Sequence, residues 1–138
     1  MNVTPTQIAL VKATLPRLTD RPAQLAMAFE MHLARYAPAM ARGVSLSPVD
    51  LLADAVALID VPGAMSRQLA PLACTLRSAG MSPRGYMALH AALMDMVTGH
   101  LGGDEALEEA YSDVIGLILA TMLAEAHGPR VQIMPLAA

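Results

Sequence analysis

Apolar residues recur along this chain at intervals of three and four, the spacing that lines one face of an α-helix. The first run lies within residues 8–18 and follows a capping box, Thr4-Pro5-Thr6-Gln7, with proline at the first helical position. Similar runs follow capping residues at four further places, which are Asp20, Ser47, Ser82 and Asp104. A further helix is expected over about residues 64–79. There is no strand-like alternation and no fixed repeat, so the pattern predicts an all-α fold of about six to seven helices.

Proline and glycine set the expected breaks between these helices. Pro16 should bend or end the first helix, and Pro71 should kink the helix over residues 64–79. Residues 38–46 predict a short turn or helix that leads into a loop. Gly80 can adopt the left-handed conformation that closes a helix, and Gly128-Pro129 should end the last one. We therefore expect one domain over residues 1–129 and an irregular tail over residues 130–138.

Composition narrows the class of protein. Apolar residues make up 55% of the 138 residues and charged residues only 15%, against about a quarter in ordinary soluble domains. This excess requires either unusually full burial or an apolar surface that a partner covers. A net charge of −3 and the lack of a basic cluster argue against a nucleic-acid partner.

Three features bear on where the protein works. Residues 114–124 carry no charge, but a membrane span needs about twenty apolar residues, so we expect a buried helix and no membrane partner. The N-terminus lacks the basic start of a secretion signal. Cys74 is the single cysteine, which excludes an internal disulfide and fits a reducing compartment. We therefore expect a cytoplasmic protein.

The stretch over residues 74–86 ends one helix and starts the next, through the turn Gly80-Met81-Ser82-Pro83 and on to Tyr86. This corner resembles that of the bacterial globin family, in both flavohaemoglobins and single-domain globins. Other segments resemble the helices of that family in order, namely residues 4–8, the step from Phe29 to Pro38, and residues 104–126. The resemblance implies a globin-like fold for the domain over residues 1–129.

In that family the corner carries the proximal histidine of the haem, four residues before the glycine. Here this position is Leu76, which offers iron no lone pair. Tyr86 matches a tyrosine that polarises the proximal histidine, and Glu125 lies within about one residue of the glutamate that assists it. A pocket tyrosine is replaced by Glu30, and a phenylalanine that wedges the haem is replaced by Val44 or a neighbour. The degenerate haem-pocket positions implied by the resemblance are Leu76, Glu30, Phe29, Val44, Val56 and Tyr86.

Two side chains near these positions have more than one interpretation. Glu30 is either a desolvated carboxylate that faces the old pocket, as a ligand or switch group, or ordinary helix surface. Cys74 is either a thiolate ligand or redox sensor, or a small buried apolar residue. We favour the buried interpretation, because Cys74 points about 200° away from Leu76 around the helix.

None of the four histidines lies in the helix over residues 64–79. We interpret His90 as a hydrogen-bonded core or interface residue, and His32 as a surface residue near the pocket. His100 and His127 each suit a helix C-terminus. The eleven methionines favour core filling over an adaptable binding surface. No catalytic set, phosphate loop or metal-spaced cluster occurs, so we expect neither an enzyme nor a metal site.

These observations favour a globin-like domain that has lost haem and acts as a sensor, a protein-interaction module or a binder of an apolar small molecule. The alternative is a haem-binding single-domain globin that binds oxygen or nitric oxide with non-standard axial ligation. A third hypothesis is a structural helical partner protein without a pocket. We expect Leu76 and nearby methionines to refill the old haem space, with at most a small cavity beside Glu30. The apolar stripes of the last two helices predict a homodimer that buries part of residues 83–123.

Overall fold

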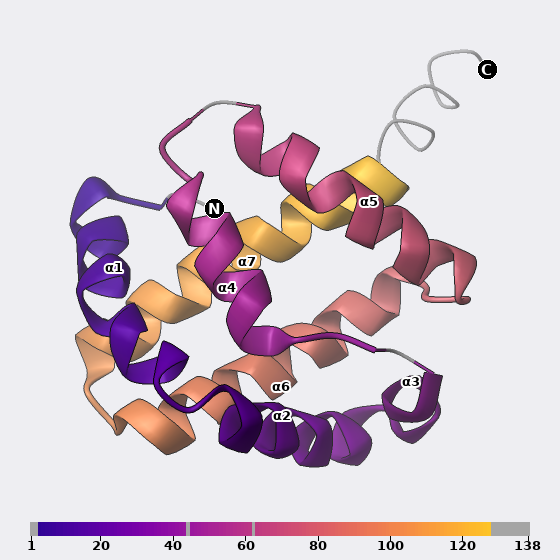
Figure 1. Cartoon of the computed structure of the whole chain (residues 1–138), viewed down its shortest axis with the longest axis horizontal. Coiled ribbons are helices and arrows are strands. Elements are labelled where there is room, and N and C mark those ends of the chain that lie inside the picture. The colour runs from indigo at the N-terminus through magenta and orange to yellow at the C-terminus, as the bar shows by residue number, and fades with distance from the viewer. Residues whose placement is uncertain (1–2, 44, 62, 128–138) are drawn as a thin grey trace.

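The computed structural model describes residues 3–43, 45–61 and 63–127, and within these ranges every regular element is an α-helix. Val44, Gly128-Pro129 and the tail over residues 130–138 lie outside the described residues. The described part contains seven helices, which confirms the all-α fold expected from the pattern (Figure 1). They are α1 (Pro5–Thr19), α2 (Pro22–Tyr36), α3 (Pro38–Gly43), α4 (Pro48–Ala57), α5 (Ala64–Ser78), α6 (Pro83–Leu101) and α7 (Glu105–Ala126).

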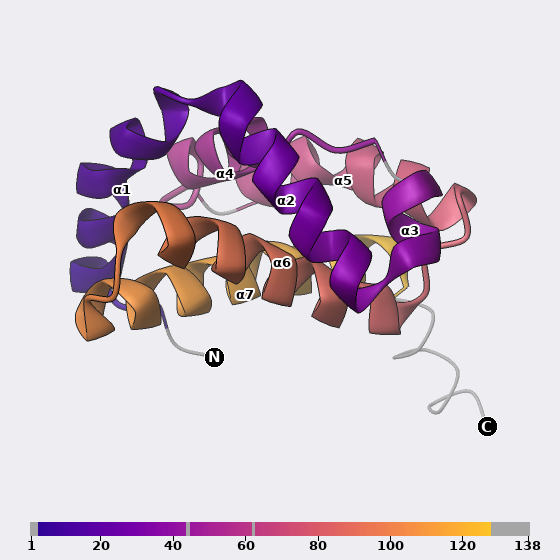
Figure 2. The same cartoon turned by 90° about the horizontal axis from the view of Figure 1, so that it is seen from below.

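The two longest helices, α6 and α7, lie side by side along the base of the molecule in Figure 2. Helix α2 packs on α6, α5 packs on α7, and α1 packs on α7 and on α4. The short helix α3 follows α2 at one end of the molecule, near the turn between α5 and α6 (Figures 1 and 2). This all-helical arrangement is consistent with a globin-like fold.

One core runs through the molecule, and each helix except α3 contributes buried residues to it. The described residues include no buried charged or polar side chain in this core. Burial of this apolar surface is the main favourable contribution to folding. The largest fully buried side chains are Val11, Leu18, Phe29, Leu33, Leu52, Leu89, Leu93, Met96, Tyr111, Ile115, Ile118 and Met122.

The helix starts agree with the sequence, but only some of the expected caps form hydrogen bonds. Thr4 completes a capping box with Gln7, and the Asp104 carboxylate accepts the backbone N–H of the second and third residues of α7. Ser47 and Ser82 have extended cap conformations without a side-chain cap hydrogen bond. There, proline at the first helical position sets the start. The expectation that Asp20 caps the second helix is wrong. Helix α2 begins at Pro22, and its cap residue is Arg21, whose side chain makes no cap hydrogen bond.

Neither internal proline ends its helix. α1 continues for three residues past Pro16, to Thr19. The Pro16 carbonyl accepts the Asp20 N–H at 3.2 Å and the Thr19 hydroxyl at 3.1 Å, so the last turn still closes. Pro71 lies inside α5 in the same way, with its carbonyl bonded to the Thr75 hydroxyl at 2.9 Å. A proline lacks only its own N–H, and hydrogen bonds to its carbonyl remain available.

Candidate functional site

The corner between α5 and α6 is held by backbone hydrogen bonds around Gly80. Gly80 has φ of 94°, the left-handed conformation expected from the sequence. Its N–H donates to the Arg77 carbonyl, and the Met81 N–H donates to the Leu76 carbonyl, each at 3.0 Å. These two bonds form a Schellman motif, which satisfies carbonyls at the end of α5. The corner therefore presents the residues after Gly80 in one defined orientation.

The six positions singled out by the resemblance separate into three groups. Four are buried: Phe29, Val56 and Leu76 are each 2% exposed, and Tyr86 is 5% exposed. Glu30 is exposed, so the interpretation in which it faces a pocket is wrong and the surface interpretation holds. Its position on α2, directly after buried Phe29, turns it out of the core. Val44 lies outside the described residues.

The donor atoms near Leu76 do not suit a haem iron. Leu76 itself has no lone pair to offer, and α5 contains no histidine. Cys74 is exposed, so our expectation of a buried apolar residue is wrong. The two positions differ because a step of two residues along a helix moves a side chain to nearly the opposite face. The residues present therefore do not fit an axial ligand at this position.

Three of the histidines lie on other helices than α5, and each has a polar atom close to a neighbouring helix. His90 Nε2 lies 3.0 Å from the Ser112 carbonyl, which confirms a hydrogen-bonded residue between α6 and α7. His100, in the last turn of α6, places Nε2 3.0 Å from the Arg17 carbonyl. His32 Nδ1 lies 3.7 Å from the Asp95 carboxylate, between α2 and α6. No group of three metal-ligating side chains is arranged to hold an ion in the described ranges.

Among the described site residues predicted from the sequence, Tyr86 is the one with a buried polar atom. Its hydroxyl is buried and has no hydrogen-bond partner among the described residues. Burial raises the pKa of Tyr86, and the nearby Cys74 thiol raises it further. Tyr111 offers a contrast, because its buried hydroxyl lies 2.9 Å from the Thr14 hydroxyl. An unpaired buried hydroxyl costs stability that a paired one does not.

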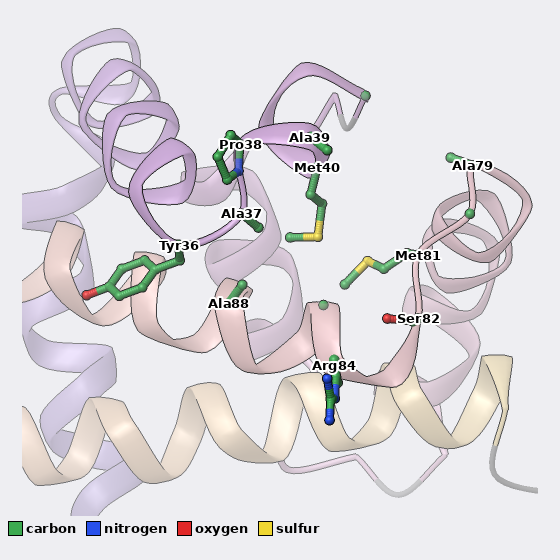
Figure 3. A pocket seen from close by; sticks show the side chains of 13 residues that line it. Tyr36, Ala37, Pro38, Ala39, Met40, Ala79, Met81, Ser82, Arg84 and Ala88 are labelled. Atoms are coloured by element: carbon green, nitrogen blue, oxygen red, sulfur yellow. The ribbon is translucent and has the colours of Figure 1, made fainter.

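A partly enclosed cleft of about 510 Å³ opens beside the corner, and we name it the corner cleft. Its walls come from the end of α2, from α3, from the turn after α5 and from the first two turns of α6 (Figure 3). Most of the lining residues are alanine, glycine, proline or methionine. Its volume lies within the range of about 300–1,000 Å³ that is typical of small-molecule sites.

Two methionines face each other across the corner cleft. Met40 from α3 and Met81 from the corner point toward one another (Figure 3). Both lie over Gly85: a Cβ built there would meet Met40 Sδ and Met81 Cγ, each at 3.0 Å. Such distances are too short for ordinary contact, so any side chain at Gly85 would displace the methionines. Glycine at position 85 therefore allows Met40 and Met81 to take the positions that shape the cleft.

Charge in the corner cleft is confined to one residue. Arg84 is the charged residue among the described lining residues, and it projects from the first turn of α6 (Figure 3). Ser82 adds a hydroxyl at the same turn. At the other end, the Tyr36 hydroxyl donates to the Asp95 carboxylate, which raises the pKa of Tyr36. This bond fixes the end of α2 against α6.

Other clefts of the described part differ in charge and depth. One of about 260 Å³ lies between α4 and α5 and includes Asp50 and Asp54. Another of about 530 Å³ is a shallower, acidic surface between α6 and α7, beside His90. None of these clefts is lined by Glu30, whose side chain faces solvent.

The methionines divide between the core and the surface. Met96 and Met122 are fully buried, which agrees with core filling. Met27, Met31 and Met87 are 67%, 69% and 74% exposed, so for them the core expectation is wrong. Their positions face away from the neighbouring helices, and no apolar neighbour covers them in the described part of the chain. Exposed methionine is a common feature of adaptable binding surfaces.

None of the five described positions chosen from the sequence lines the corner cleft. The sequence did single out the corner itself, through Gly80 and the start of α6, but as a fold signal. The sequence analysis missed a set of small residues that come from three separate segments of the chain. These residues are Ala37, Ala39, Ala79, Gly85 and Ala88. Separately these residues look like ordinary helix positions, and only their convergence in space forms a cleft.

No described helix is both long enough and apolar enough to cross a membrane. No protein-family model matches this chain, and no curated protein matches it either.

Proposed function

We propose that this chain is a haem-less, globin-like domain that senses a small apolar molecule in the corner cleft. One observation carries the proposal. Leu76, where the resemblance requires an iron ligand, is 2% exposed in the core, while a separate cleft of about 510 Å³ opens at the corner that follows it. An apolar cleft with a few polar groups is the usual form of a small-molecule site. The domain acts as a binding module and not as an enzyme.

The walls of the cleft suggest how binding becomes a signal. Helix α3 has no fully buried residue and packs on the core only through the partly buried Met40 and Ala41, so its contact with the core is limited. The opposite wall is tied to the core by the hydrogen bond from Met81 to Leu76. A molecule that contacts both Met40 and Met81 would order α3 against this wall. We take the ordering of α3 to be the conformational output, because a ligand favours the state to which it binds better.

Decanol serves as the probe in protein labelled with ¹³C at the methionine ε-methyl groups. The signals of Met40 and Met81 should shift in a saturable manner, and amide hydrogen exchange in α3 should slow. The signals of Met27 and Met31 provide the control, since both residues are exposed on α2 and do not line the cleft. Unchanged signals at Met40 and Met81 would overturn the proposal.

A haemin titration tests the other half of the proposal. Binding should be weak and non-stoichiometric, without the sharp spectrum of a defined axial ligand, because position 76 is a leucine. A one-to-one complex with a defined ligand would establish the alternative function, a haem-binding globin with non-standard ligation. One observation favours that alternative: the Tyr86 hydroxyl is buried without a partner.

Self-association through the last two helices belongs to the same proposal. Met87 on α6 is 74% exposed, and Leu117 and Leu123 on α7 are only partly buried. Exposed apolar side chains of this kind are typical of interfaces. Sedimentation velocity at high micromolar concentration should show a dimer that Met87→Glu weakens, whereas Met27→Glu on α2 should have no effect. A wild-type monomer would remove this part of the proposal.

The setting of the domain is proposed as cytoplasmic. Cys74 has no second cysteine in the chain with which to pair, and its exposure suits a compartment that keeps thiols reduced.

A further inference from the structure

The corner cleft combines an apolar body with one positive edge. Met40 and Met81 form its facing walls, and Gly85 and Ala88 lie on the stretch of α6 between them. Arg84 and Ser82 stand at the first turn of the same helix. No acidic residue is found among the described lining residues. A ligand that matches both parts must itself be apolar along its length and carry a polar group at one end.

The apolar part suits a narrow, flexible chain. A Cβ at Gly85 would approach Met40 Sδ and Met81 Cγ to 3.0 Å, so the two methionine side chains cover this glycine and form the apolar surface of the cleft. The methionine side chains are unbranched and adapt to the shape of a neighbouring molecule. An unbranched alkyl chain can lie along such a surface, whereas a flat ring system would require wider separation of the two walls.

The polar part suits an anion. Arg84 is exposed and forms no ion pair with any residue that the structure describes. The Ser82 hydroxyl makes no cap hydrogen bond to α6, so it remains available as a donor. The N-terminal end of α6 carries the positive end of the helix dipole. A guanidinium presents paired N–H donors that match the two oxygens of one carboxylate.

We propose that the corner cleft binds a single-chain alkyl carboxylate, with the chain along the side chains of Met40 and Met81 and the carboxylate beside Arg84. This inference rests on the proposed function and names the ligand class of the same site. A single cation at the edge matches a single negative charge, so a carboxylate is preferred to a phosphate ester that carries two. The apolar contacts provide most of the affinity, and the charge of Arg84 provides the selectivity for a carboxylate head group.

The test compares decanoate, decanol, decyl phosphate and decylamine in titrations of the ¹³C-methionine protein. Decanoate should bind about tenfold more tightly than decanol, which corresponds to about 1.4 kcal/mol, with decyl phosphate and decylamine weaker than decanoate. High salt should reduce the preference for decanoate, because an exposed charge is screened. All four probes should shift the ¹³C signals of Met40 and Met81.

Two pairs of variants locate the interaction. Arg84→Gln should bring decanoate affinity down to that of decanol and leave decanol binding unchanged, whereas Arg17→Gln, exposed at the end of α1, should change neither. Gly85→Ala should weaken all probes at least fivefold, whereas Gly99→Ala in the same helix should not, since a Cβ there meets nothing within 4 Å. Arg84 is exposed, so its variant tests the inference even if Gly85→Ala folds poorly.

The possible outcomes distinguish failure of the carboxylate proposal from failure of the proposed small-molecule binding. Equal binding of decanol and decanoate at Met40 and Met81, unaffected by Arg84→Gln, would overturn the carboxylate and leave the proposed function standing. Tighter binding of decyl phosphate would also overturn the carboxylate, in favour of a phosphate ester. Failure of every probe to shift Met40 and Met81 would overturn both.

Discussion

The backbone N–H of Met81 donates a hydrogen bond of 3.0 Å to the carbonyl of Leu76. This bond joins a wall of the corner cleft to the residue that stands where the globin resemblance places an iron ligand. Both side chains are buried, at 6% and 2% exposure, so the apolar contact that accompanies a Schellman motif is available here as well. The cleft therefore has one wall hydrogen-bonded to the end of α5 and one wall, α3, that packs on the core only through partly buried residues.

Gly80 should be required for the backbone of this corner. Gly80→Ala should lower the free energy of unfolding by about 1–2 kcal/mol, because an L-residue is strained in the left-handed conformation. A Cβ at this position meets nothing within 4 Å, so crowding makes no contribution. Gly99→Ala, inside α6 without positive φ, should instead raise the stability by about 0.5–1 kcal/mol. Urea unfolding measures both, and the same sign for both variants would contradict this account.

The two buried tyrosines should respond in opposite ways to loss of the hydroxyl. Tyr111→Phe should lower the free energy of unfolding by about 1 kcal/mol, because it removes a hydrogen bond of 2.9 Å to Thr14. Tyr86→Phe should leave stability unchanged or raise it by up to about 1 kcal/mol, since its hydroxyl is buried without a partner. Chemical unfolding of the two variants in parallel provides the measurement. A large loss in Tyr86→Phe would show that its hydroxyl has a partner in solution.

The stability of the domain should fall in alkaline solution. Burial raises the pKa of Tyr86 and of Tyr111 above the ordinary value of 10.0, so the unfolded chain loses these protons first. The stabilisation is fully present below pH 10.0 and is lost as the pH rises through the higher pKa values of the folded state. The free energy of unfolding, measured from pH 8 to about 11, should fall less steeply in the double variant Tyr86→Phe/Tyr111→Phe. Equal slopes would refute this linkage.

Cys74 should react in the folded protein. Its exposure predicts that one thiol per chain is modified by DTNB in native buffer, at a rate close to that in urea. A matched control moves the thiol by two residues, in the variant Cys74→Ser/Leu76→Cys. There the thiol replaces a side chain that is 2% exposed, so modification should be slow until the protein unfolds. Protection of the wild-type thiol would place Cys74 in an interface or against a neighbouring group.

Much of the fold could be predicted from the sequence because local signals were strong. The capping box at Thr4, the proline at position 83 and the glycine at position 80 each act through the backbone of adjacent residues. The apolar spacing identified most of the core, including Phe29 and Val114, because a helix turns a periodic sequence into one buried face. Helix α2 begins at Pro22, one residue later than a cap at Asp20 would place it, because Arg21 and not Asp20 occupies the cap position.

The sequence by itself thus determined an all-helical domain, its corner at Gly80 and the leucine at position 76. Only the tertiary structure decided that Glu30 and Cys74 face solvent, that the Tyr86 hydroxyl is buried alone, and that small residues from three segments leave a cleft beside Met40. The physical reason is the range of the forces involved. Caps, turns and helical periodicity depend on neighbours along the chain, whereas exposure and empty volume depend on which distant side chains pack together.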